Sequence, residues 1–253
     1  MHPLWQPIDR ARDICPRLLT MPAIDPNRLA RQVDDLVALP DEPIQIARAV
    51  RDLVEEYSVR AKSSVPSVSR PVIRSLRGAL QQHAQPMAIA EAVWKESLPD
   101  TQLLAAGMLE RIEDPVVAAT AKRWASQNVP IEIVRELGAR GLTGWRQANP
   151  TGFMDQVTSW LDEHRGRGRV LALYALRERV SDPDFEDLPS VLSLIEGRLD
   201  GARGEMREAL VALITALEKV APEETVNFLD EEKASPLVKT LKARFDRQSV
   251  RMV

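Results

Sequence analysis

A six-residue pattern occurs twice in this chain, and its spacing limits the architectures that the chain can adopt. Residues 110–115 read Glu-Arg-Ile-Glu-Asp-Pro, and residues 178–183 read Glu-Arg-Val-Ser-Asp-Pro, 68 positions later. Each copy closes an apolar run with helical periodicity. Self-similarity at a fixed offset is typical of repeat proteins. An offset of two units of about 34 residues predicts a series of helical hairpins.

Alanines at matching places in four successive apolar runs support this unit. They are separated by 34, 33 and 37 positions, and they are Ala105, Ala139, Ala172 and Ala209. Small residues recur where helices pack closely, so we expect these runs to be inner helices of consecutive hairpins. The runs are 101–112, 131–142, 169–180 and 205–220.

The repeated hexapeptide has the composition of a junction between two helices. Arg111 and Arg179 suit a last turn, where a cation meets the partial negative charge of the helix C-terminus. Asp114 and Asp182 are expected N-caps, and the proline after each suits the first turn of the next helix. Asp25 and its following proline predict another helix start. We assign the hexapeptide no chemistry.

Composition completes the fold prediction. The chain has 253 residues, 44% hydrophobic and 28% charged, and its 18 prolines mostly lie between apolar runs. Alternating apolar and polar residues, which indicate strands, are missing. We predict an all-α superhelix (a HEAT-like solenoid of antiparallel hairpins, about 12–14 helices, no sheet) over 26–253 as one domain, after an N-terminal extension at 1–25. The expected helices are 26–39, 43–62, 71–83, 86–97, 100–112, 115–127, 130–142, 151–164, 169–180, 188–199, 204–220, 222–231 and 236–247, with a short one around 8–19 and a loop at 63–69.

Cysteine and histidine usage argues against a secreted or metal-binding protein. Cys15 is the single cysteine, which excludes an internal disulfide and fits a reducing cytosol. Residues 1–12 lack the apolar core of a signal peptide, and no run of about 20 apolar residues predicts a membrane span. His2, His83 and His164 are not at metal-ligand spacing. We therefore expect a cytoplasmic monomer with no metal and no cofactor.

Charge is distributed unevenly along the chain. Residues 135–179 contain eight Lys and Arg against five Asp and Glu, whereas residues 181–235 contain five against fourteen. In the first segment, residues 164–169 read His-Arg-Gly-Arg-Gly-Arg directly before an expected inner helix. Glycine lets the backbone approach a ligand closely, and the forked donors of arginine match the oxygens of a phosphate. The N-terminus of the following helix also attracts anions. We take Arg165, Arg167 and Arg169 as candidate phosphate ligands; the alternative is a solvated loop with capping charges.

The tryptophans divide into two groups. Trp94, Trp124 and Trp160 lie near the C-terminal ends of expected helices, where packing in the core is the favoured role. Trp145 lies in an expected loop beside Arg146, so this pair is a candidate for stacking on a base or a partner. The alternative for Trp145 is an apolar plug that closes the loop.

Three segments in a fixed order resemble the DNA alkylation repair proteins of the AlkD type. They are Pro-Val-Ile-Arg at 71–74, Ala-Glu-Ala-Val-Trp at 90–94 and Leu-Leu-Ala-Ala at 103–106. The resemblance continues through Trp160, the inner helix after residue 169 and the run 204–231. It implies a HEAT-like solenoid and, in active members of the family, excision of alkylated purines from DNA.

The positions that match the family's active site have largely changed. Active members carry a Trp-x-x-x-Asp pair, whose carboxylate stabilises positive charge developing on the sugar. Here the matching residues are Ile131 and Arg135, and a cation at 135 opposes such a transition state. A second family tryptophan matches Ala212. The family's active-site arginine matches Arg169, with Arg167 as an alternative register.

Three functions remain open from the sequence. The first is DNA or other nucleic-acid binding without standard glycosylase chemistry, through Arg135 and the candidates above. The second is an active alkylpurine glycosylase that replaces the missing acid with Glu132 or Glu136, although each lies one residue from an expected position and so points away from the groove. The third is a protein-interaction scaffold whose acidic block binds a basic partner. Convergence of the arginines on the inner face would favour the first function, and outward scatter would favour the scaffold.

Overall fold

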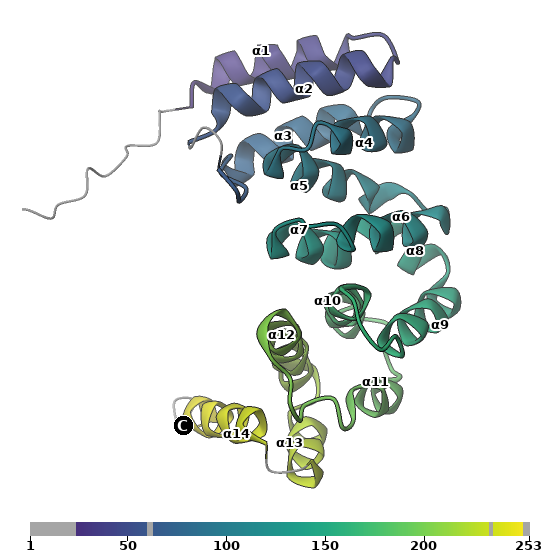
Figure 1. The fold of residues 1–253 in the computed structure, drawn as a ribbon, viewed down its shortest axis with the longest axis vertical. Coiled ribbons are helices and arrows are strands. Elements are labelled where there is room, and N and C mark those ends of the chain that lie inside the picture. Colours follow the sequence, from purple (N-terminus) through teal and green to yellow (C-terminus); the bar gives the residue numbers. More distant parts are fainter. Residues whose placement is uncertain (1–23, 60–62, 233–234, 250–253) are drawn as a thin grey trace, which may run out of the picture.

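The computed structural model describes residues 24–59, 63–232 and 235–249. Figure 1 shows helices that follow one another in chain order through a curved stack. Every regular element in the described ranges is helical, as the sequence predicted. Within these ranges, no helix combines the length and the apolar character needed to cross a membrane.

The helices have the following bounds. The α-helices are α1 (Pro26–Val37), α2 (Pro43–Tyr57), α3 (Arg70–Leu80), α4 (Pro86–Lys95), α5 (Pro99–Met108), α6 (Val116–Ala125), α7 (Ile131–Glu136), α8 (Thr143–Ala148), α9 (Pro150–Leu161), α10 (Gly168–Val180), α11 (Leu188–Ile195), α12 (Gly204–Val220), α13 (Pro222–Glu231) and α14 (Pro236–Ser249). A 3-10 turn, η1 (Leu109–Arg111), extends α5, and a π-helical turn, η2 (Leu137–Gly141), extends α7.

Two rows of helices build the stack. The helices α1, α3, α5, α7, α10 and α12 contact one another in this order, and we call them the inner row. Figure 1 shows α5, α7, α10 and α12 of the inner row on the inside of the curve, with α4, α6, α9 and α11 on its outside. The four alanine-containing runs supply α5, α7 with η2, α10 and α12, so the sequence correctly assigned them to one row.

Prolines start helices here, as their positions predicted. Nine of the described helices carry proline at one of their first two positions (α1, α2, α3, α4, α5, α9, α11, α13 and α14). A proline there loses no hydrogen bond, because the first-turn N–H groups have no partner inside the helix. Before α1, Asp25 Oδ1 accepts a hydrogen bond from the N–H of Asn27 at 3.0 Å, which confirms the predicted cap.

The core runs between the rows. Helix α10 is buried on nearly every side, which suits an inner helix between two neighbours. Trp94 and Trp124 stack with ring centroids 4.1 Å apart, and Trp160 is buried as well. The core role predicted for these three tryptophans is confirmed.

The second copy of the hexapeptide behaves differently from the first. Asp114 Oδ1 accepts a hydrogen bond from the N–H of Val116 at 2.8 Å, directly before α6. The N-cap of α6 is Pro115 rather than the predicted Asp114, so the helix starts one residue later than expected. Asp182 does not open a helix, so that prediction is wrong. The next helix, α11, begins at Leu188, and its N-cap is Asp187, which accepts from the N–H of Ser190 at 3.3 Å. The expected helix around 8–19 and Cys15 lie outside the described residues.

Candidate nucleic-acid interface

A groove of about 590 Å³ lies on the inner row between α10 and α12. Helix α7 contributes one residue to its wall and α14 contributes another. The lining residues are Arg135, Tyr174, Arg177, Ser181, Glu208, Val211, Ala212, Thr215, Ala216, Lys219, Val220 and Arg244. We call it the inner groove.

Helical spacing explains why these side chains share one wall. Tyr174 and Arg177 on α10 and Ser181 at its C-cap are three and four positions apart, so they lie on one face of that helix. The groove residues of α12, from Glu208 to Val220, also recur every three or four positions and so share one face of α12. Small or short side chains at Ala212 and Ala216 leave the space between the two helices unfilled.

The inner groove is strongly cationic. Four of its residues are Lys or Arg (Arg135, Arg177, Lys219 and Arg244), whereas Glu208 is its single carboxylate. Arg135 and Lys219 form no ion pair with any described residue. A concave surface with one sign of charge concentrates the field and attracts ions of opposite sign.

Two of these cations have only weak or neutral partners. Arg177 Nη1 lies 3.6 Å from Glu178 Oε1, the carboxylate of its chain neighbour. Arg244 Nη1 donates to the hydroxyl Oγ1 of Thr215 at 3.4 Å. Neither contact neutralises the groove, because each leaves most guanidinium donors free to bind an anion.

Tyr174 adds a buried hydroxyl to the wall. Its side chain is 1% exposed, and the guanidinium carbon of Arg135 lies 5.4 Å from its ring centroid. The hydroxyl is buried and has no hydrogen-bond partner among the described residues. An unsatisfied buried polar group costs about 1–3 kcal/mol. The wall therefore holds a polar group that the protein itself leaves unsatisfied.

The arginine–glycine segment does not converge on this groove. Arg165 is exposed, and Arg169 is half-buried with an unpaired Nε. Arg167 binds inside the protein: its Nε donates to Glu205 Oε2 at 2.9 Å, and its Nη1 donates to the carbonyl oxygens of Gln127 (3.3 Å) and Val129. Most donors of Arg167 are therefore occupied by the fold, and none of the three arginines lines the inner groove with Arg135.

Trp145 and Arg146 lie in a helix and are buried, so their predicted loop position is wrong. They lie on α8, a short helix that the sequence analysis missed. Trp145 is 3% exposed and packs edge-on against Phe153, with centroids 5.7 Å apart. Arg146 is 4% exposed and pairs with Asp182. Neither side chain presents a face to a nucleic acid, and Trp145 instead has the role of an apolar plug.

The two glutamates considered as substitute acids lie away from the groove. Glu132 is exposed and does not line it. Glu136 Oε1 lies 3.3 Å from Arg140 Nε and 3.5 Å from Arg77 Nη1. Burial raises the pKa of Glu136 above its usual range, against the opposing effect of these two arginines. The carboxylate of Glu136 therefore pairs with Arg77 and Arg140 within the protein and does not face the inner groove.

Of the predicted site residues, the structure places Arg135 in the groove and brings Ala212 beside it. The sequence analysis missed Tyr174, Arg177 and Lys219, because these residues join Arg135 only when α10 and α12 pack beside α7. Among the described residues, no group of three or more His, Cys, Asp or Glu side chains could hold a metal ion. Neither protein-family models nor curated proteins match this chain.

Proposed function

We propose that this protein is a HEAT-like solenoid of the DNA alkylation repair type that binds DNA in the inner groove and lacks standard glycosylase chemistry. The arginine–glycine segment does not converge with Arg135, so that expectation for DNA binding is not met. The proposal rests instead on the charge of the inner groove, in which four cations face one carboxylate. A phosphodiester backbone is the extended anion that best matches such a surface.

The arrangement of the helices supports the solenoid. Successive inner helices contact one another, and each copy of the hexapeptide ends a helix of the inner row. The family resemblance gains support from the groove as well. Arg135 and Ala212 match the family's acid and second tryptophan, are far apart in sequence, and line the same groove.

The chemistry of the groove favours binding over cleavage of a glycosidic bond. Cleavage develops positive charge on the sugar, which a nearby carboxylate stabilises. Here the matching position carries Arg135, and three more cations lie around it. Such a site stabilises phosphates and opposes an oxocarbenium ion. Incubation with methylated duplex DNA should therefore release no more methylated base than the heat-inactivated protein does.

Fluorescence anisotropy with a labelled duplex tests the binding site. The groove variant combines Arg135→Glu, Arg177→Glu and Lys219→Glu. The matched control combines Arg48→Glu, Lys95→Glu and Arg165→Glu, which make the same charge change at exposed positions outside the groove.

The groove variant should bind at least about a hundredfold more weakly than the wild type at low salt. Each lost phosphate contact should also reduce the slope of log K against log salt by about 0.9, or about 2.7 for three contacts. The control should keep most of the affinity. Equal losses in the two variants would show that net charge alone drives association and would refute the groove as the binding site.

A further inference from the structure

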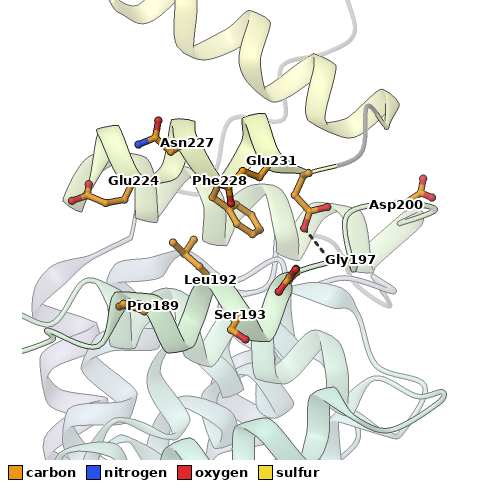
Figure 2. A pocket seen from close by; sticks show the side chains of 11 residues that line it. Pro189, Leu192, Ser193, Gly197, Asp200, Glu224, Asn227, Phe228 and Glu231 are labelled. Carbon is orange, nitrogen blue, oxygen red and sulfur yellow. Dashed lines mark hydrogen bonds between the residues drawn. The ribbon is translucent and has the colours of Figure 1, made fainter.

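A second groove, of about 640 Å³, lies between α11 and α13 (Figure 2). Its lining residues are Pro189, Leu192, Ser193, Glu196, Gly197, Asp200, Glu224, Asn227, Phe228, Glu231 and Glu232. We call it the outer groove. Helix α13 packs mainly on α12 and α14, whereas α2 and α4 in the first layers pack directly on each other. The space between α11 and α13 therefore stays open.

The floor of the outer groove is apolar. Leu192 on α11 and Phe228 on α13 point towards each other across the gap in Figure 2. Both pack against the core on one side and remain partly exposed. Pro189 extends this surface at the first turn of α11. Covering such a surface is favourable, because it removes apolar area from water.

The rim of the outer groove is acidic. It carries five carboxylates and no Lys or Arg, and these carboxylates belong to Glu196, Asp200, Glu224, Glu231 and Glu232. Glu232 Oε1 accepts a hydrogen bond from the N–H of Gly197 at 2.8 Å. None of the five forms an ion pair within the described part of the chain. Asp230, on α13 but outside the groove, does pair with Lys242 at 2.6 Å.

We infer that the outer groove is a docking site for a basic peptide segment of a partner protein. One large apolar side chain of that segment lies between Leu192 and Phe228, and flanking Lys or Arg side chains face the acidic rim. A metal ion does not fit, because the described carboxylates include no cluster that could hold one. A simple polyamine would leave the apolar floor uncovered. The acidic rim requires a partner segment with positive charge, and the apolar floor requires an apolar side chain on that segment.

Two labelled nonapeptides test the inference on the full chain at physiological salt. In the first, a central phenylalanine has four lysines on each side; in the second, glycine replaces the phenylalanine. The wild type should bind the phenylalanine peptide at least about tenfold more tightly, since only that peptide covers the floor. Equal binding of both peptides, or no saturable binding of either, would overturn the proposal.

Substitutions on α13 locate the contact. Glu224→Lys should weaken binding of the phenylalanine peptide at least about fivefold. Glu223→Lys is the matched control, because it makes the same change in the same first turn but does not line the groove. Phe228→Ala should abolish the preference for phenylalanine over glycine, a ratio measured on one folded protein. Equal effects of the two lysine substitutions, or an unchanged preference in Phe228→Ala, would refute the site.

This inference stands apart from the proposal for the inner groove. The triple variant Arg135→Glu, Arg177→Glu and Lys219→Glu should still bind the phenylalanine peptide, and Glu224→Lys should still bind DNA. These two measurements therefore show separately whether the proposal for each groove fails.

Discussion

The guanidinium of Arg146 binds both carboxylate oxygens of Asp182: Nε lies 3.0 Å from Oδ2, and Nη2 lies 3.2 Å from Oδ1. Arg146 belongs to α8, and Asp182 lies in the turn that follows α10. The side chain of Arg146 is 5% exposed and that of Asp182 is 19% exposed. This forked pair therefore joins two successive layers of the stack where little water reaches it.

Asp182→Ala should lower the free energy of unfolding by about 3 kcal/mol, because the buried guanidinium of Arg146 loses its partner and Arg179 loses its contact with Asp182 at 3.3 Å as well. Urea denaturation with an unchanged m-value measures this. Asp184→Ala is the control: Asp184 pairs with Arg179 at 3.2 Å but is 76% exposed, so its loss should cost less than about 1 kcal/mol. Similar losses for the two variants would show that the pair with Arg146 does not bind the layers together.

The two aspartates of the repeated hexapeptide show how far the sequence could predict the fold. Asp114 forms a bond two residues away, and such local bonds are readable from spacing, as are the proline-started helices. Asp182 is bound by Arg146, 36 positions earlier. Nothing in the local pattern distinguishes the two aspartates, because the difference comes from which helix packs beside each of them.

The same limit applies to the candidate site. Arg135 was correctly placed on an inner helix, but its companions Arg177, Lys219 and Arg244 come from three other helices. Arg167 was predicted to bind phosphate, because local composition cannot show that Glu205 and two main-chain carbonyls occupy its donors. Trp145 was predicted in a loop because the short α8 follows the π-helical turn with no periodic signal of its own.

Gly138→Ala should destabilise the protein by about 1–3 kcal/mol, because the added methyl group overpacks the contact between η2 and α10. A Cβ at Gly138 would lie 2.7 Å from the Cβ of Tyr174 and 2.9 Å from the carbonyl oxygen of Leu171. Gly78, inside α3, has open space around it, so Gly78→Ala should stabilise by about 0.4–1 kcal/mol through reduced chain entropy. Thermal unfolding of the two variants shows whether each substitution stabilises or destabilises the protein. Stabilisation by both would mean that α10 shifts to accommodate the added methyl group at no cost.

Glu136 should make stability fall as pH rises. Burial, the largest cause, raises the pKa of this carboxyl in the folded state above its unfolded value. Between the two pKa values the folded state binds more protons, so the free energy of unfolding decreases with increasing pH. Glu136→Gln removes this contribution.

The wild type should thus lose stability relative to Glu136→Gln from the usual glutamate range upwards, until the raised pKa is passed. Urea titrations between about pH 4 and about pH 8 measure the difference. Glu132→Gln, on the same helix but exposed, corrects for changes common to any lost carboxylate. A difference that moves in favour of the wild type would mean that Arg77 and Arg140 outweigh burial.

Arg167→Ala should weaken folding and leave DNA binding intact. Its guanidinium ties Glu205 on α12 to the carbonyl oxygens that follow α6, so its loss removes a charge-assisted contact between layers. Such bonds are worth about 1.5–3 kcal/mol, and we expect a loss of that size in the free energy of unfolding.

Arg167→Lys should recover only part of this stability, since an ammonium cannot reproduce the forked donors of the guanidinium. A phosphate ligand would behave in the opposite way: the slope of log K against log salt would fall by about 0.9 while stability stayed the same. Measuring both quantities on one preparation therefore decides whether Arg167 serves the fold or the DNA.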